Sequence, residues 1–415
     1  MTTAEKYYTF LDESWPTNVT FVAELDRVFP AEYVEARWRE FSAQRIFTRS
    51  MPTADLMIVD GGMSRVDFQA REVAAEELDD EVARESMIGH GTEKVVHCRY
   101  WTVPGLDRSR IALVAHHAIA DGRAGIAELQ QFVRFLGGID VPAQQHVSVP
   151  RVAERDRYPW QADRKELLAL LRALGDRNRE LGPPEPSSWP AVTLERRPRF
   201  AHLAHPAGTA TRLADAAARD HARMFPAIAA AAMTAVVRHV AARDVGTLQL
   251  NVAVDLASER PHLNRPPAMN VGVVSQRQSV RVDDPWQLAR DVTAALGTSL
   301  KRGEGELFFD LSRVDKAEDI GAGTALVAAA IENAAPAASV THIGTVDAAD
   351  DPEWLTEIWA NQAPTPNQVI QAVSLEYRGR LVHCVTTDDL RVPTVVARSL
   401  LADLARAIED MAEPA

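Results

Sequence analysis

Two consecutive histidines, followed by an aspartate and a glycine, form the segment of the chain best suited to chemistry. They are His116, His117, Asp121 and Gly122, within the run IALVAHHAIADG at 111–122. Neighbouring side chains on a strand point to opposite faces, so one imidazole is expected to enter a site and the other to pack in the opposite direction. An imidazole with its usual pKa near 6.5 can take a proton from an alcohol or amine that attacks a carbonyl.

The aspartate and glycine lie where this run passes into a helix. Asp121 can cap that helix or pair with a distant cation, and Gly122 allows a tight turn or a close backbone approach. Two other interpretations of the histidines remain open at this point. They can be a structural pair, or they can bind a metal. A metal needs three or four converging ligands, and apart from His202 and His205 the other histidines are scattered, so we expect no metal.

Several familiar site patterns are missing from the sequence. The chain has no GxxxxGK[ST], no HExxH and no GxSxG, and GAGTAL at 321–326 lacks the third glycine of a dinucleotide-binding turn. These absences argue against a P-loop protein, a zinc protease of the HExxH type and an α/β-hydrolase.

Composition narrows the class further. The 415 residues carry a formal charge of −13, with 58 acidic and 45 basic side chains, which argues against a nucleic-acid partner. The two cysteines, Cys98 and Cys384, are far apart and suit a reducing cytosol. The N-terminus lacks a secretory apolar region, and the longest apolar stretch, 224–237, is short for a bilayer span. We expect a cytoplasmic protein without stable membrane insertion.

The elements that must position the histidines alternate between strand and helix. An apolar strand at 111–115 leads into the histidines, and an amphipathic helix follows Gly122. The first half is also predicted to have strands at 18–29, 55–60, 65–70 and 95–103, and helices at 32–44, 74–87 and 164–181. The second half is predicted to have strands near 200 and at 248–254, 271–280, 339–344, 369–377 and 381–386, with helices at 211–222, 226–242, 284–301, 323–333 and 395–411. The fold class is therefore mixed α/β (α+β).

A proline-rich segment separates two halves of similar size. GPPEPSSWP at 182–190 has four prolines in nine residues, which is typical of a stiff linker. The sequence predicts an N-terminal domain at 1–181 that carries the histidines, a linker at 182–195 and a C-terminal domain at 196–415.

HHAIADG, at 116–122, resembles the HHxxxDG motif of the chloramphenicol-acetyltransferase-like superfamily, which includes condensation domains and polyketide-associated acyltransferases. The segment 251–280 is similar to the strand, turn and strand of the condensation type, and 376–411 is similar to the last strands and closing helix. The resemblance implies two similar domains arranged in a V, with a tunnel between them.

The resemblance also implies the site. His117 would be the general base, and His116, Asp121 and Gly122 would support it, with Asp121 paired to Arg260 of the other domain. The alternative for Arg260 is an exposed position in a turn. An acyl-CoA or a phosphopantetheine-linked thioester would be the co-substrate, with no permanently bound cofactor. The partners would be a small-molecule acceptor, with a hydroxyl or an amine, and an acyl or peptidyl carrier protein.

Some residues depart from the condensation-domain pattern. The turn at 258–261 is Ser-Glu-Arg-Pro in place of Ser-Gly-Arg-Pro, and 274–276 is Val-Ser-Gln where Phe-Val-Asn is usual. These departures argue against a chain-elongating condensation domain. The main hypothesis is an acyltransferase of natural-product or lipid biosynthesis. The alternatives are an enzyme that cyclises or isomerises a carrier-bound intermediate and a non-catalytic assembly-line partner, which the intact motif disfavours.

Overall fold

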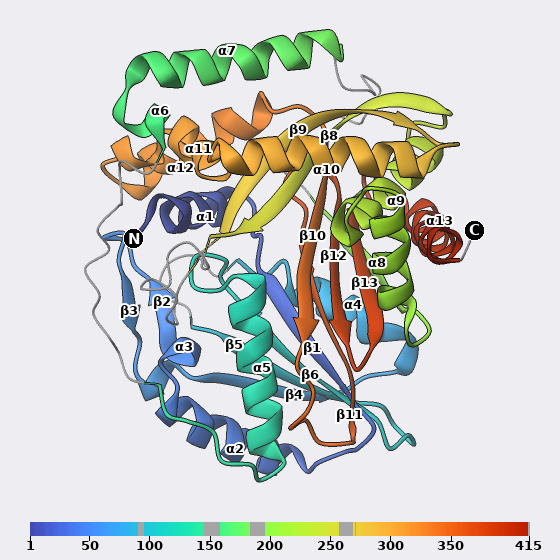
Figure 1. Cartoon of the computed structure of the whole chain (residues 1–415). Helices are drawn as coiled ribbons and strands as arrows, with labels where there is room; N and C mark the ends of the chain where they lie inside the picture. The colour runs from blue at the N-terminus through green and yellow to red at the C-terminus, as the bar shows by residue number, and fades with distance from the viewer. Residues whose placement is uncertain (90–94, 145–157, 183–195, 257–268, 270, 414–415) are drawn as a thin grey trace.

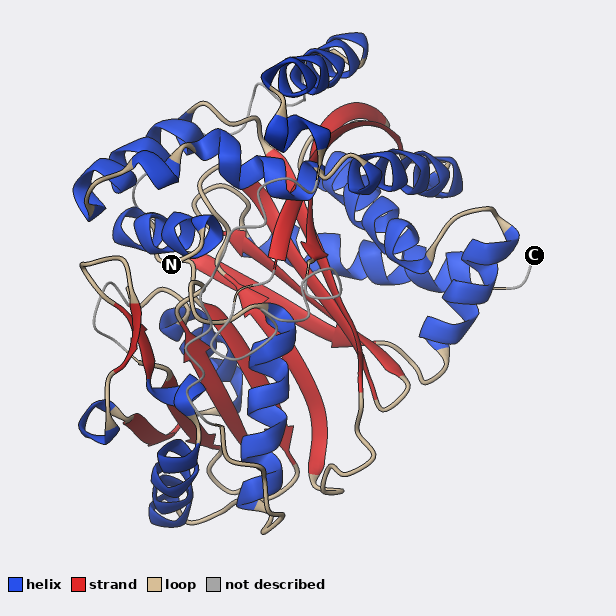
Figure 2. Cartoon of the chain, turned by 60° about the vertical axis from the view of Figure 1, so that its left-hand side comes forward, coloured by secondary structure: helices blue, strands red, loops and turns tan. Residues whose placement is uncertain are grey.

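The structure is a computed structural model that describes residues 1–89, 95–144, 158–182, 196–256, 269 and 271–413. These residues form a five-stranded sheet, a six-stranded sheet and a two-stranded ribbon, with helices packed around the two large sheets (Figures 1 and 2). The expected mixed α/β class is confirmed.

An apolar run forms the centre of the first sheet. β6 (Ser109–Ala115) is buried along its whole length, as a strand with neighbours on both edges and cover on both faces must be. The sheet order is β11-β1-β6-β5-β4, and only the β4–β5 pair is parallel. The other strands are β1 (Val19–Leu25), β4 (Asp67–Glu72), β5 (His97–Thr102) and β11 (Leu355–Gln362).

Two helices bury their apolar sides against this sheet. They are α2 (Ala31–Gln44) and α5 (Gly122–Leu136), and both contribute aromatic side chains to the same core as β1. Trp38 of α2 and Phe132 of α5 meet edge to face, with ring centroids 4.9 Å apart. The amphipathic helix expected after Gly122 is confirmed, and its packing fixes the end of the loop that carries the histidines.

Two elements cross between the halves of the sequence. β11, from the second half, pairs antiparallel with β1, so that Gln362 lies opposite Val19. α1 (Thr3–Ser14), from the first half, packs against α12 (Ile320–Glu332) of the second. Of the expected linker at 182–195, only Gly182 lies within the described residues.

The second sheet has the order β7-β13-β12-β10-β8-β9. β10 runs parallel to both β8 and β12, and the remaining pairs are antiparallel. Its strands are β7 (Pro198–Ala204), β8 (Val245–Asp255), β9 (Val271–Arg281), β10 (Ala337–Val346), β12 (Gln368–Tyr377) and β13 (Arg380–Asp388). One face is covered by α8 (Thr209–Arg219), α9 (Met224–His239), α10 (Pro285–Lys301) and α13 (Thr394–Ala412), and the first sheet, α1 and α12 lie on the other side (Figure 1).

The remaining elements are short or lie at the surface. They are α3 (Ile46–Arg49), β2 (Ser50–Pro52), β3 (Ile58–Asp60), α4 (Leu78–Glu85), α6 (Pro159–Ala162), α7 (Arg164–Glu180), α11 (Glu304–Ser312) and the 3₁₀ turns Met63–Arg65, Ala75–Glu77 and Val314–Lys316. α7 corresponds to the helix expected at 164–181; it is rich in charged residues and buries only Leu170. Among the described helices, none is long and apolar enough to cross a bilayer.

Gly125 sets how closely α5 approaches β1. A Cβ atom at this position would lie 1.9 Å from the ring of Phe21, far inside contact distance. We expect Gly125→Ala to lower the free energy of unfolding by about 2–3 kcal/mol, because Phe21 is fully buried and its ring would have to shift within a packed core. The measurement is urea unfolding followed by circular dichroism.

Gly175→Ala in α7 is the matched control, since a Cβ atom there meets nothing within 4 Å. This variant should gain about 0.5–1 kcal/mol from the better helix propensity of alanine. A Gly125→Ala protein as stable as the Gly175→Ala protein would show that the α5–β1 contact is looser than described.

Candidate functional site

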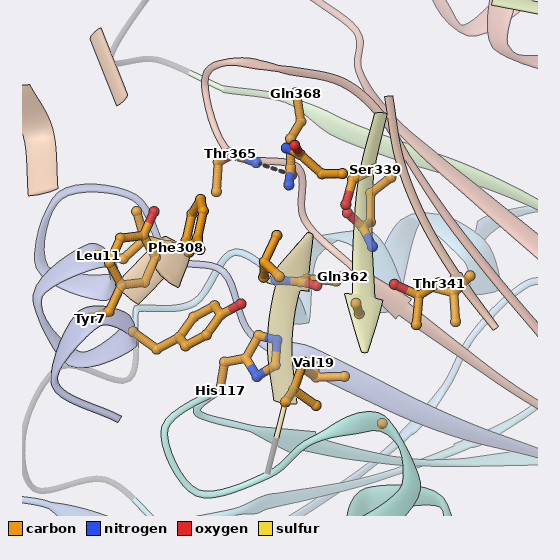
Figure 3. Close-up of a pocket in the computed structure, with 18 of the residues that line it drawn as sticks. Tyr7, Leu11, Val19, His117, Phe308, Ser339, Thr341, Gln362, Thr365 and Gln368 are labelled. Carbon is orange, nitrogen blue, oxygen red and sulfur yellow. Dashed lines mark hydrogen bonds between the residues drawn. The ribbon is translucent and has the colours of Figure 1, made fainter. Parts of the chain in front are cut away.

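His117 lies just after β6, on the loop that leads into α5, and its ring lines a cavity (Figure 3). Its Nδ1 is 2.9 Å from the carbonyl oxygen of Ala120. Because a carbonyl oxygen can only accept, Nδ1 must carry the proton and donate it. In the neutral ring, Nε2 therefore keeps its lone pair and can accept a proton from a bound molecule.

His116 has the opposite tautomer. It is fully buried, and its Nδ1 accepts a hydrogen bond from the backbone N–H of Ala118 at 2.9 Å. The proton of the neutral ring is therefore on Nε2, which lies 3.8 Å from the carboxylate of Asp12 in α1. His117 lines the cavity and His116 does not, so the structure places the two imidazoles in different surroundings.

Burial keeps both imidazoles neutral. Burial removes solvent from the His117 ring and lowers its pKa to about 4. The backbone hydrogen bonds raise the pKa, but by less than burial lowers it. Burial also lowers the pKa of His116, although the carboxylate of Asp12 opposes that change. The ring of Tyr8 lies over His117, with ring centroids 4.0 Å apart. At pH 7 the His117 ring is therefore an uncharged base shielded on one side by an aromatic ring.

Asp121 caps α5, as one of the two readings of the sequence expected. Its carboxylate accepts the backbone N–H of Ala124 at 2.9 Å. Arg260, the expected partner from the other half, lies outside the described residues, so that pair remains a prediction. A Cβ atom at Gly122 would lie 3.1 Å from Ile343 of β10, so this glycine allows the motif to approach the second sheet closely.

Arg123, the residue after the motif, joins the two halves. Its guanidinium lies 2.7 Å from the carboxylate of Asp255, at the end of β8, and also donates to the backbone carbonyl of Ile343 at 3.0 Å. The ion pair is largely exposed, so its own contribution to stability is small. Sequence reasoning missed Arg123, although a cation directly after the motif glycine was a readable signal.

The cavity has a volume of about 330 Å³ and lies where the two sheets meet α1, α11 and α12. Figure 3 shows His117 at one side of it, with Val19 next to the ring and Gln362 across from it. The lining residues are Tyr7, Tyr8, Leu11, Val19, His117, Gly122, Asn251, Ala253, Val271, Val273, Phe308, Ala330, Ile331, Ala334, Ser339, Thr341, Ile343, Ala360, Gln362, Thr365, Asn367, Gln368, Gln371 and Val373.

Three of the elements that enclose the cavity were not predicted from the sequence. α1 provides Tyr7, Tyr8 and Leu11, α11 provides Phe308, and β11 provides Gln362. For α1, the sequence does contain one signal of a helix start. Thr2 and Glu5 form a capping box at the start of the helix, a pattern that can be found in sequence. The sequence carried no comparable signal for α11 or β11.

The polar residues of the cavity do not form a metal site. Within the described residues, no cluster of three or more histidine, cysteine, aspartate or glutamate side chains could hold a metal ion. No cavity-lining side chain in this part of the chain belongs to lysine, arginine, aspartate or glutamate. The groups that face a bound molecule are one imidazole, two phenols, amides, hydroxyls and apolar side chains.

Solved structures share this arrangement over nearly the whole chain. The trichothecene 15-O-acetyltransferase from Fusarium sporotrichioides is 10% identical, with a TM-score of 0.68 over 98% of this chain and 94% of that chain. The first condensation domain of the calcium-dependent antibiotic synthetase is 15% identical, with a TM-score of 0.66 over 100% and 97%. Polyketide synthase associated protein 5 from Mycobacterium tuberculosis is 13% identical, with a TM-score of 0.62 over 97% of each chain.

This chain has the condensation-domain fold. The fold implied by the resemblance of HHAIADG to the chloramphenicol-acetyltransferase-like superfamily is thus confirmed. The sequence matches no protein-family model, and it matches none of the curated proteins with which it was compared. The support for the condensation-domain fold is therefore one short sequence motif, HHAIADG, together with the similarity of the three-dimensional structures. The through-going tunnel implied by the same resemblance remains a prediction, since the described residues outline a cavity.

Proposed function

We propose that the protein is an acyltransferase that moves an acyl group from a thioester to a hydroxyl or an amine, with His117 as the general base. The observation that carries this proposal is the His117 ring, which lines the cavity with its Nδ1 held by the Ala120 carbonyl and its Nε2 left as the basic atom. A neutral imidazole in this state can take the proton of an attacking hydroxyl or amine.

The proposed reaction has two steps. In the first, the acceptor oxygen or nitrogen attacks the thioester carbonyl while its proton passes to Nε2 of His117. In the second, the tetrahedral intermediate collapses, the C–S bond breaks and the proton moves from Nε2 to the departing thiolate. The products are an ester or amide and a free thiol, and the imidazole returns to its neutral form. No covalent acyl-enzyme is formed.

The surroundings of His117 support both steps. The hydrogen bond to Ala120 orients the ring and helps to carry the positive charge that the ring holds between the steps. Tyr8 covers one face of the ring, and the cavity brings together α1, β10 and β11, so both substrates can be held in a fixed geometry. We assign supporting roles to His116, Asp121 and Gly122, which shape the loop, and to Arg260 the role of partner to Asp121.

The donor and partners follow from the same proposal. We propose acyl-CoA or a phosphopantetheine-linked thioester as co-substrate, a small-molecule acceptor, and an acyl or peptidyl carrier protein where the donor is carrier-bound. No permanently bound cofactor is needed for the two steps. The similar structures include a polyketide synthase associated protein and a synthetase condensation domain, which supports a place in natural-product or lipid biosynthesis. Cys98 and Cys384 are both free and buried, which supports a cytoplasmic location.

A transfer assay tests the proposal. The protein is incubated with a panel of acyl-CoA thioesters and with alcohols and amines, and the mixtures are analysed by mass spectrometry and by a thiol reagent. We expect the release of CoA thiol to match the amount of acylated acceptor, and to stop when the acceptor is left out. Thiol release without an acylated product, or turnover that survives His117→Ala, would contradict the proposal.

A second candidate uses the same base without transfer between molecules. Similar solved structures include a cyclization-docking bidomain and an epimerization domain, which supports cyclisation or isomerisation as the second candidate. A cyclising enzyme would change the mass of a carrier-bound intermediate with no separate acceptor, and an isomerising enzyme would leave the mass unchanged. A non-catalytic partner would give no product in any of these assays.

A further inference from the structure

Arg123 is the first side chain of α5, and it reaches across to the second half of the chain. Its Nε donates to the carbonyl oxygen of Ile343 in β10 at 3.0 Å, and its Nη1 lies 2.7 Å from the carboxylate of Asp255 at the end of β8. A Cβ atom at Gly344 would lie 3.5 Å from its Nη2. One guanidinium therefore contacts two strands of the second sheet.

The carbonyl group that Arg123 uses lies at an irregularity of β10. This strand pairs with β12 on both sides of residues 343–344 but not at them, and its pairing with β8 ends at Val340. Gly344 has a φ of 99°, a conformation that favours glycine. Because Ile343 lies outside both ladders of the described sheet, its carbonyl oxygen is available to the guanidinium of Arg123.

The other end of α5 is held by a buried carboxylate of the second half. The side chain of Asp351 is buried, and it accepts from Arg134 at 2.6 Å, from Gln130 at 2.8 Å and from the Tyr377 hydroxyl at 2.9 Å. Arg123 is eleven residues before Arg134, which is about 16 Å along the helix. This attachment remains when Arg123 is removed, so the helix keeps its place while its first turn loses a contact.

The first turn of α5 is also the end of the loop that carries the catalytic candidate. Asp121 caps the helix, and a Cβ atom at Gly122 would lie 3.1 Å from the side chain of Ile343. His117 and Ile343 both line the cavity, one from the first half of the chain and one from the second. The two hydrogen bonds of Arg123 thus hold the His117 loop against the cavity wall that β10 forms.

The contacts of Arg123 are poorly placed to stabilise the fold. Its side chain is 64% exposed and that of Asp255 is 32% exposed, and ion pairs of this kind contribute little to the free energy of unfolding. Catalysis depends more steeply on position, since a displacement of about 1 Å between reacting groups can cost on the order of 10²-fold in rate. A contact that matters little for folding can therefore matter for turnover.

We propose that Arg123 is a positioning residue, which holds the loop of His117 against β10 and so sets the distance from Nε2 of His117 to a substrate bound on the second sheet. The effect on turnover rests on the proposed function, whereas the contact between the loop and β10 can be measured without it. The charges are the reverse of those in the Asp121–Arg260 pair that the resemblance implies. Here the motif side supplies the cation and the second half supplies the anion.

Two measurements on Arg123→Met test the proposal. Methionine keeps a long, unbranched side chain and removes both the charge and the donors. In the transfer assay we expect kcat to fall about tenfold and KM to stay within about twofold, because the residues that line the cavity are unchanged. In methyl-labelled protein, the nuclear Overhauser effect between the Cδ1 methyl group of Ile343 and the Hα protons of Gly122 should weaken. That methyl carbon lies 3.2 Å from the position of a Cβ atom at Gly122, so the parent signal should be strong.

Arg123→Lys and Arg199→Met are the matched variants. Lysine keeps the charge and a donor but loses the planar fork, so it should restore part of the kcat and part of the nuclear Overhauser effect. Arg199 of β7 forms a partly exposed ion pair with Asp80 of α4 at 3.2 Å, which also joins the two halves but lies outside the cavity lining. Arg199→Met should change neither readout. All three variants should keep the urea midpoint of the parent protein.

The outcomes separate this proposal from the proposed function. Parental kcat or a parental nuclear Overhauser effect in Arg123→Met would overturn the positioning role, and so would an equal loss of kcat in Arg199→Met. A lowered urea midpoint in Arg123→Met would make the role structural and would also overturn it. If the parent protein transfers no acyl group, the proposed function fails and the nuclear Overhauser effect alone decides: a weakened signal supports the contact, and an unchanged signal overturns it.

Discussion

His117→Ala is expected to lower kcat by about 10²- to 10⁴-fold, the usual contribution of a general base. The loss should fall on kcat, because the other residues that line the cavity come from several helices and strands of both sheets and still hold the substrates when the imidazole is absent. The protein should keep its fold, since the ring lines a cavity and makes one hydrogen bond to the backbone, at Ala120. Steady-state kinetics and a denaturant unfolding curve on the same preparation measure both effects.

His116→Ala is the matched control, one residue away. This change leaves the N–H of Ala118 without its acceptor and removes the imidazole that faces Asp12, so we expect the free energy of unfolding to fall by about 1–3 kcal/mol. The kcat of the folded fraction should change only slightly. Equal and small losses of kcat in both variants would refute the role given to His117.

The pH profile gives a second readout on His117. Its pKa is lowered to about 4 by burial, so the free enzyme keeps the neutral ring at pH 6 as well as at pH 8. We expect kcat/KM to be the same at these two values. A histidine with an ordinary pKa near 6.5 would be about three-quarters protonated at pH 6, and kcat/KM would fall about fourfold.

Acid should unfold the protein steeply. Five histidines have a lowered pKa because burial penalises the charged ring: His116, His117, His205, His342 and His383. In the unfolded chain their pKa is near 6.5, so below that pH the unfolded state binds more protons and stability falls. For His117 and His342, whose pKa is about 4, this amounts to about 2 kcal/mol each between pH 8 and pH 5. The other three act in the same direction.

Other buried groups change the size of this loss of stability at low pH, but near pH 6 stability still falls as the pH falls. Glu409 favours the charged form of His205, whereas Arg123 adds to the lowering of the pKa of His342. Burial raises the pKa of Glu85 and Glu128, so these carboxyls take up protons in the folded state and offset part of the loss toward pH 5. Since whole domains have only about 5–15 kcal/mol of stability, the loss is a large fraction of the total.

Urea unfolding at a series of pH values measures the loss. The slope of the unfolding free energy against pH measures how many more protons the unfolded state binds than the folded state. His342→Gln should reduce that difference by about one proton. His221→Asn is the control, because it removes an exposed imidazole and leaves the five buried rings in place. A free energy of unfolding that stays constant from pH 7 to pH 5 would contradict the prediction.

The sequence predicted best those elements whose own hydrophobic pattern matches the way they are buried in the fold. β6 is an uninterrupted apolar run and α5 an amphipathic helix, and both are present in the structure. β11, LTEIWANQ, carries Glu357, Asn361 and Gln362, so its pattern does not stand out as a buried strand. The position of β11 in the sheet is determined by its pairing with β1, and no local sequence pattern predicts that contact.

The site was predictable only in part for the same reason. The motif located His117 and indicated that the two histidines would differ in orientation, because that information lies in neighbouring residues. Tyr8, Phe308 and Gln371 reach the cavity from α1, α11 and β12, and their proximity to His117 depends on how the two sheets meet. Residue type alone does not distinguish the unpaired Gln371 from Gln368, whose carboxamide oxygen accepts the N–H of Thr365.

The pairing of β1 with β11 has a consequence for biosynthesis. Leu25 and Leu355, which pair across these strands, are 355 − 25 = 330 positions apart in the chain. A ribosome adds about 5–20 residues per second, so one edge of β1 stays open for roughly 16 to 66 s after β1 is made. An open strand edge can pair with other chains, and a nascent chain with such an edge is a substrate for chaperones. That exposure ends only when the last quarter of the chain emerges and supplies β11.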